Sequence, residues 1–166
     1  MNSTYLFFMV TVEDRLEQLG LKLPEPPIPL GAYVPAVRVG NLLFISGVLP
    51  MYGRELAVRG KVGTGANRVP LEQVHEAGRI AVLNALAIAK QELGSLDKIK
   101  RVVKMIGYVA ADPDFEQHSL ALNGASELLL AVFGESGMHA RVAVGVSSLP
   151  GNSPIEIELV FEVKEE

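Results

Sequence analysis

The stretch ARVAVGVSSLPGNSPIEIELVFEV, residues 140–163, contains two predicted β-strands separated by a segment rich in Ser, Pro and Gly. Side chains of a strand point alternately to the two faces of a sheet. In the first strand, residues 141–147, three valines share one face. On the other face Arg141 stands beside three small residues: Ala143, Gly145 and Ser147. A guanidinium beside small side chains leaves room above the sheet and can grip a carboxylate, so this face predicts a pocket floor; an exposed arginine fits the same pattern.

The second strand, residues 155–163, alternates even more regularly. Its apolar face carries Ile155, Ile157, Leu159 and Phe161, and its other face carries Glu156, Glu158 and Glu162. A solvated outer face accounts for these glutamates as well as a functional site does, because carboxylates are mostly exposed. In a simple hairpin Glu156 would lie opposite about Ser147, roughly 20 Å along the strand from Arg141 at ~3.3 Å per residue. A pocket shared by Arg141 and Glu156 therefore needs a different strand order or residues from two chains.

The sequence before these strands predicts three strands, a helix, a strand and a second helix. The first three strands are expected over residues 33–39, 42–45 and about 55–62, with Gly40-Asn41 as a hairpin turn. The first helix is expected from Pro70 to Leu93, with Gly94 as its stop, and its predicted core-facing stripe is Val74, Ala77, Ala81, Ala85 and Ile88. Residues 98–110 predict a strand, and Asp112-Pro113 predicts the start of a helix that runs to about Phe133. This order predicts an α+β fold with both helices covering one face of a mixed sheet.

The first ten residues do not have the pattern of a signal peptide or a membrane anchor. Residues 1–10 are apolar but lack a basic leader and a cleavage site, and they are too short to span a bilayer. Thr11-Val-Glu-Asp14 predicts a capping box that opens a helix through Leu19, followed by a proline-rich tether. We therefore interpret residues 1–166 as a single domain. Residues 1–10 are a candidate extension, since Met9 offers an alternative start, and residues 11–30 are interpreted as a helix and a tether.

Composition narrows the classes of function. The chain has 166 residues, 49% of them hydrophobic and 20% charged, which suits one domain with a real core. Its net charge of -4 disfavours nucleic acid as a partner. The lack of cysteine excludes disulfides and thiolate nucleophiles and favours the cytoplasm. His75, His118 and His139 are too far apart in sequence for a local ligand motif, so we expect no metal site.

Residues 140–150 followed by Ile155-Glu-Ile-Glu158 resemble the Rid family of reactive intermediate deaminases, also called YjgF or L-PSP. The resemblance covers the chain from about Pro29 to Val163. Other residues that match the family in order are Gly31-Ala-Tyr33, Gly40 to Gly47, Leu49-Pro50, Gly94-Ser-Leu96 and Asn123. The resemblance implies a chorismate-mutase-like fold, a homotrimer with a central barrel, and ligand clefts at the subunit interfaces. We accordingly expect the sheet face that carries Arg141 and Glu156, with no helix over it, to meet neighbouring chains.

The resemblance also implies an activity and its residues. Deaminases of the family hydrolyse 2-imino or enamine acids to 2-keto acids and ammonia without a cofactor. Arg141 would bind the substrate carboxylate, and Glu156 would hold or activate water and relay protons. The other residues that match the family's cleft are Tyr33, Ser46, Gly47, Asn123 and Ala143. Tyr33, Ser46 and Asn123 also suit purely structural roles, and the sequence does not decide between Glu156 and Glu158, which share a face.

Three departures from the deaminase pattern keep other functions open. His139 stands where the best-known members have proline, a helix precedes the domain, and the segment between Asn123 and Arg141 is one residue longer. One alternative is a non-catalytic, chaperone-like trimer that binds small carboxylates. The other is ribonuclease activity or translation inhibition, for which the only basic cluster is Lys98, Lys100, Arg101 and Lys104. We interpret that cluster as a charged strand edge that discourages aggregation.

Overall fold

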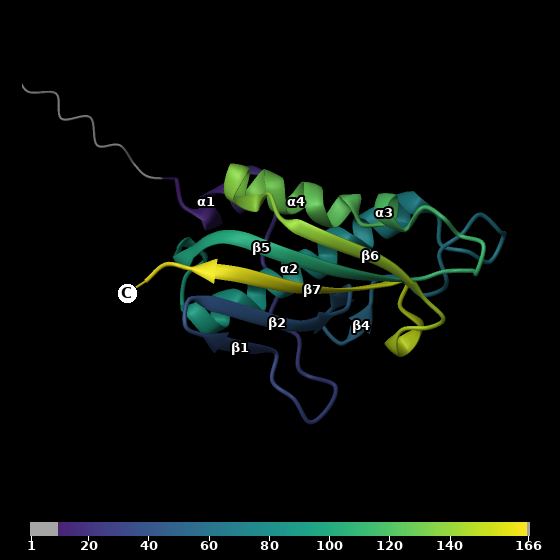
Figure 1. Ribbon diagram of the computed structural model, residues 1–166, viewed down its shortest axis with the longest axis horizontal. Helices are drawn as coiled ribbons and strands as arrows, with labels where there is room; N and C mark the ends of the chain where they lie inside the picture. Colours follow the sequence, from purple (N-terminus) through teal and green to yellow (C-terminus); the bar gives the residue numbers. More distant parts are fainter. Residues whose placement is uncertain (1–9, 166) are drawn as a thin grey trace, which may run out of the picture.

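A five-stranded mixed sheet forms the body of the protein in a computed structural model that describes residues 10–165 (Figure 1). The candidate start at Met9 lies outside these residues. The strands of this sheet are β1 (Ala36–Val39), β2 (Leu42–Val48), β5 (Ile99–Ala110), β6 (Ala140–Val146) and β7 (Ile155–Val163). Their order is β1-β2-β7-β5-β6, and β5 and β6 are parallel while the other neighbours are antiparallel. The last two strands of the chain therefore do not pair, because β5 lies between them.

The register across β5 places Arg141 and Glu156 on opposite faces. Met105 lies opposite both Arg141 and Leu159, whereas Tyr108 lies opposite both Val144 and Glu156. Directly opposed residues project from the same face of a sheet. Arg141 thus shares the face of the fully buried Met105, which the helices cover. The expectation that Arg141 and Glu156 share an uncovered face is wrong.

Two long helices cover one face of the sheet, as predicted. Helix α2 (Leu71–Leu93) lies behind the sheet in Figure 1, and α4 (Asn123–Phe133) runs alongside β6. All five predicted core-facing residues of α2 are buried, and Gly94 ends the helix in the left-handed conformation, with φ 82°. Pro70 is the N-cap of α2 and does not lie within its first turn. The two helices cross closely, since a methyl group at Gly124 would lie 2.6 Å from the Cα of His75.

The helix predicted from Asp112 begins later and is broken. Helix α3 spans His118–Ala121, and Leu122 separates it from α4. Asp112 does not cap a helix, because its Oδ1 accepts a hydrogen bond from Nη2 of Arg68 at 2.9 Å and ties two loops together. Residues 116–117 are therefore loop, and α3 is a single turn that lies against β6.

The predicted third strand is absent from the main sheet. Residues 51–56 form a separate small hairpin of β3 (Met51–Tyr52) and β4 (Glu55–Leu56), and Val62 makes only isolated bridges to Val69 and Ala111. Gly60 has φ 121°, a conformation that ends an ordinary strand, and its N–H donates to the carbonyl of Asn152. The apolar residues after Gly60 thus pack beside the sheet without extending it.

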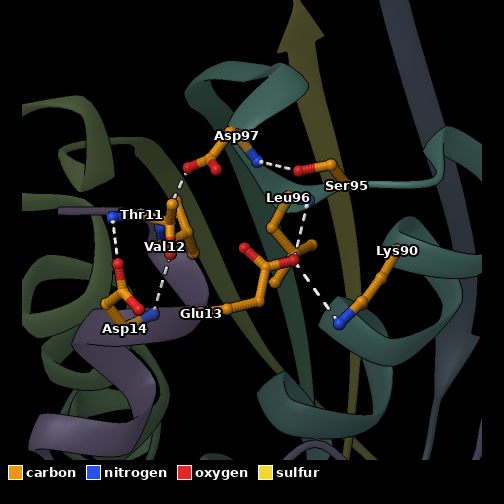
Figure 2. A network of polar contacts seen from close by, with 8 residues as sticks. All are labelled: Thr11, Val12, Glu13, Asp14, Lys90, Ser95, Leu96 and Asp97. Carbon is orange, nitrogen blue, oxygen red and sulfur yellow. Dashed lines mark hydrogen bonds and ion pairs between the residues drawn. The ribbon is translucent and has the colours of Figure 1, made fainter. Parts of the chain in front are cut away.

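The predicted capping box opens α1 (Val12–Gln18), and α1 docks at the carboxyl-terminal end of α2, around Lys90 and the turn that follows the helix (Figure 2). Thr11 Oγ1 accepts from the N–H of Asp14 at 3.0 Å, and Asp14 Oδ2 accepts from the N–H of Thr11 at 2.8 Å. The docking bonds come from the turn η1 (Leu96–Lys98): Asp97 Oδ1 accepts from the N–H of Val12 at 2.9 Å, and Leu96 N–H donates to Glu13 at 3.4 Å. Glu13 also pairs with Lys90 at 3.5 Å. These contacts fix the helix that precedes the proline-rich tether.

The sheet face opposite the helices is apolar at many positions and open. Val142 and Val144 are 43% and 40% exposed there, and Phe44 is 44% exposed. Their register partners on the same face include Glu156, Glu158 and Val160. No helix within residues 10–165 is long and apolar enough to cross a membrane. A face with this many exposed apolar side chains suits contact with another protein surface.

Candidate functional site

Residues predicted for one cleft lie in two separate groups. The first group lines a cleft of about 1320 Å³ between the tether, β2 and β7. It contains four of the predicted residues, Tyr33, Ser46, Gly47 and Glu156, together with Glu158. The second group surrounds Arg141 on the helix side of the edge strand β6 and includes Asn123. The two groups lie on opposite faces of the sheet, so one chain does not bring them together.

Glu156 is half-buried in the first group, against the backbone of β2. A methyl group at Gly47 would overlap its Oε1 and lie 2.9 Å from its Cδ. The pairing of β2 with β7 is irregular between Ile45 and Val48, and this irregularity places Gly47 beside the carboxyl. A larger residue at position 47 would therefore displace the Glu156 carboxyl from its place beside β2.

Ser46 and Tyr33 hold the tether at the mouth of this cleft. Ser46 Oγ donates to the carbonyl of Val34 at 2.7 Å, and Tyr33 Oη accepts from the N–H of Leu30 at 3.3 Å. The Tyr33 ring is half exposed, at 49%. Both residues thus have a structural role that the sequence analysis had left open, and both also line the cleft.

The environments of Glu156 and Glu158 differ. Burial, and secondarily the negative charge of Glu158, raise the pKa of Glu156 above its ordinary value of 4.5. Glu158 Oε1 accepts a hydrogen bond from Tyr108 at 2.9 Å. That hydrogen bond, followed by burial, raises the pKa of the Tyr108 phenol, which keeps its proton on the bond to Glu158. Paired carboxyls in different environments suit different proton-transfer roles.

Arg141 is bonded to side chains of α3 and α4. Its Nη1 donates to Asn123 Oδ1 at 3.2 Å and to Ser126 Oγ at 3.0 Å, in a part-buried setting. Its Nη2 donates to the carbonyl and the Oγ of Ser119, at 3.1 and 2.8 Å, at the surface. The guanidinium is thus fixed from one side by helix α4, while its other amino group is bonded only to an exposed serine.

The floor predicted beside Arg141 is partly occupied by the protein itself. Ala143 is half-buried and packs against the core, and the His118 ring covers Gly145, where a methyl group would lie 3.1 Å from the imidazole Cδ2. Phe115 packs edge-on against the same ring, with centroids 5.1 Å apart. The room that small residues leave on this face is therefore filled in part by Phe115 and the His118 ring of α3.

The sequence did not predict the contacts of Ser119, Ser126 and Tyr108, and it marked His139 only as a departure from the family's proline. Ser126 could have been found, because it lies three residues after Asn123 and hence on the same helix face. Tyr108 could not, since its contact with Glu158 depends on the pairing of β5 with β7. Within residues 10–165, no three His, Asp or Glu side chains gather as a metal site would require.

Comparisons with known proteins agree on one family. Residues 13–163 match the family described as YjgF/chorismate mutase-like, putative endoribonuclease. The chain is 37% identical over 153 residues to protein TCP17 of Trypanosoma cruzi, covering 92% of this chain and 94% of that protein. It is 28% identical over 144 residues to a 2-iminobutanoate/2-iminopropanoate deaminase of Dermatophagoides farinae, covering 87% and 95%.

Two crystal structures resemble the whole fold. A protein of unknown function from Agrobacterium tumefaciens is 43% identical, with a TM-score of 0.84 and coverage of 92% of both chains. A putative endoribonuclease from Shewanella oneidensis MR-1 is 37% identical, with a TM-score of 0.87, covering 92% of this chain and 99% of the other. The α+β fold and its helix-covered mixed sheet are therefore shared with known structures.

Proposed function

Since this chain belongs to the Rid/YjgF/L-PSP family, we propose that it hydrolyses reactive 2-imino or enamine acids to 2-keto acids and ammonia, without a cofactor. The observation that carries the proposal is the Arg141 guanidinium, which α4 holds in one orientation while its Nη2 stays at the surface. One relative named as a 2-iminobutanoate/2-iminopropanoate deaminase supports the reaction class. The lack of cysteine suits a reducing cytoplasm as the location.

The catalytic cleft of our proposal lies between two chains of a homotrimer. One small substrate cannot touch both Arg141 and Glu156 of the same chain, because they project from opposite faces of the sheet. Arg141 stands on the edge strand β6, at the rim of the chain, and the open sheet face offers apolar residues to a neighbour. Stacking the rim of one chain on the open face of the next would bring Arg141 to the partner's Glu156 cleft.

Substrate binding at Arg141 exchanges a weak contact for a stronger one. The substrate carboxylate replaces the neutral acceptors of Ser119 at Nη2, while Asn123 and Ser126 keep Nη1 in place. A charge-assisted hydrogen bond is roughly twice as strong as a neutral one, which favours the exchange. The clamp fixes the imine carbon relative to the attacking water, so positioning supplies part of the rate.

Glu156 then handles the protons. As a carboxylate it takes one proton from the water that attacks the imine carbon, and as an acid it returns that proton to the nitrogen. This gives a tetrahedral carbinolamine, and Glu156 next moves the proton of its hydroxyl to the same nitrogen. The carbon–nitrogen bond breaks, ammonia leaves, and the carbonyl of the 2-keto acid forms. Glu156 suits this exchange better than Glu158, because its raised pKa lies closer to neutrality and Tyr108 already occupies Glu158.

The proposal is tested with 2-iminopropionate, generated from serine by a dehydratase, and with two arginine variants. Wild-type protein should speed ammonia release, Arg141→Ala should lose this effect, and Arg79→Ala, at a partly exposed arginine of α2 that pairs with Glu76, should keep it. A folded wild type that binds pyruvate saturably but releases no ammonia would instead be the non-catalytic carboxylate binder.

The endoribonuclease description in the matching family has less support from the surface of this chain. Lys100, in the basic cluster of β5, is paired with Glu162 at 2.7 Å. A net charge of -4 adds to the unfavourable balance for binding phosphates. Cleavage of a single-stranded RNA that persists in Arg141→Ala protein, at low salt, would favour the ribonuclease over the deaminase.

A further inference from the structure

A chain of hydrogen bonds continues behind Arg141 to His139. Arg141 Nη1 donates to Ser126 Oγ at 3.0 Å, Ser126 Oγ lies 3.0 Å from His139 Nε2, and His139 Nδ1 lies 2.6 Å from the carbonyl oxygen of Gly137. Ser126, His139 and Arg141 are all half-buried. His139 is also the position at which the sequence departs from the proline of the best-known family members.

The direction of each bond follows from the chemistry of its atoms. A carbonyl oxygen only accepts, so Nδ1 of His139 carries a hydrogen and donates to Gly137. In the neutral ring Nε2 is then an acceptor, and the hydroxyl hydrogen of Ser126 points to it. With its own hydrogen directed at His139, Ser126 Oγ presents its lone pairs to the Arg141 guanidinium.

The carbonyl that sets this order is itself fixed. Gly137 is buried against α4, and a methyl group there would overlap the carbonyl oxygen of Leu129 and lie 2.8 Å from its carbon. Helix α4 therefore holds both ends of the chain of hydrogen bonds, through Ser126 directly and through the packing of Gly137. The orientation of the imidazole is determined by the backbone and does not depend on a bound ligand.

We propose that His139 is a positioning residue that acts through Ser126 to hold Arg141 in the orientation that binds a substrate carboxylate. The inference rests on the carboxylate-binding role of Arg141 within the proposed function, and it does not require turnover. Without the acceptor at Nε2, the Ser126 hydroxyl is free to rotate, and its lone pairs no longer face Nη1 in a fixed direction. Asn123 alone then restrains that amino group.

Three variants separate positioning from packing. His139→Phe keeps a flat ring but removes both nitrogens, His139→Gln restores an acceptor near the place of Nε2, and Ser126→Ala removes the intermediate hydroxyl. Pyruvate, a 2-keto acid, serves as the probe, with calorimetry for its Kd and steady-state kinetics with 2-iminopropionate for kcat and KM. Thermal unfolding of each variant reports whether its fold is retained.

The expected result is a loss of affinity with little change in kcat. His139→Phe and Ser126→Ala should each raise the Kd for pyruvate about fivefold, the effect of one hydrogen bond, and raise KM in parallel. The double variant should be no weaker than either single variant, because both remove the same interaction. His139→Gln should stay within about twofold of wild type in Kd, since the acceptor is kept.

Several outcomes would overturn the inference. These are a His139→Phe protein with wild-type Kd, effects of the two substitutions that multiply in the double variant, and a wild type that binds no pyruvate. A nitrogen-15 spectrum that shows the Nε2–H tautomer of His139 would do the same without any ligand. Binding with the expected pattern but without ammonia release would refute the deaminase and leave the positioning role intact.

Discussion

Two inactive variants should restore each other's activity if every cleft takes Arg141 from one chain and Glu156 from the next. Arg141→Ala chains retain Glu156, and Glu156→Gln chains retain Arg141, so a mixed trimer contains interfaces at which both native residues meet. In a random mixture of equal amounts, half of the clefts keep the arginine and half keep the glutamate. About one quarter of the clefts should then be intact, which predicts about a quarter of wild-type activity.

The assay is ammonia release from 2-iminopropionate by the whole, unfractionated mixture, after the two variants have been unfolded and refolded together so that their chains assort at random. A second mixture checks the fraction of intact clefts. Wild type combined with the double variant Arg141→Ala/Glu156→Gln should also have about a quarter of its clefts intact. A site contained within one chain would keep about half in that mixture and none in the first. Mixed assemblies that stay as inactive as the single variants, beside an active wild type, would refute the two-chain cleft.

Three further substitutions test individual contacts. Glu156→Gln should stabilise the protein at pH 8 and leave its stability unchanged below about pH 4. Burial raises the pKa of the Glu156 carboxyl in the folded protein above 4.5, so the stability of the wild type falls relative to the variant as the pH rises above 4.5. Urea unfolding at both pH values checks this, and an equal difference at both would contradict it. Gly47→Ala should reduce kcat/KM for 2-iminopropionate about 100-fold by displacing Glu156, while the Kd for pyruvate, set by Arg141, stays near wild type. Ser119→Ala should tighten pyruvate binding about two- to fivefold, because a competing hydrogen bond to Nη2 is lost; calorimetry that finds weaker binding would show that Ser119 helps to hold the arginine.

Local patterns in the sequence predicted most of the helices and strands. The period-2 alternation of residues 155–163 and the apolar stripe of α2 depend only on neighbours in the chain, and both are confirmed. The strand predicted over residues 55–62 is not formed, because β4 pairs only with the two residues of β3 and Gly60 then takes a backbone conformation that composition alone does not reveal. The predicted helix start at Asp112 is wrong, because the Asp112 carboxylate does not cap a helix and instead accepts a hydrogen bond from Arg68, forty-four residues earlier.

The relation between Arg141 and Glu156 was beyond the reach of local patterns. Alternation tells which residues of one strand share a face, and it correctly grouped Arg141 with Ala143 and Glu156 with Glu158. Matching the faces of two strands also needs their order and register, which are set by long-range pairing. Because β5 inserts between β6 and β7, the two residues are separated by a strand and a face, and the two-chain cleft of the proposed function is argued from that separation.

The docking of α1 changes how the cleft can be altered in evolution or by design. The tether runs from helix α1, which Asp97 holds in place, to the start of β1 at Ala36, so both of its ends are anchored. Tether residues between these ends form one wall of the cleft that contains Glu156. Lengthening such a loop by a few residues costs little free energy. If the proposed function holds, insertions and deletions in the tether would therefore change the space available to the substrate side chain without changing Arg141 or Glu156, and the length of the tether would set the range of substrates.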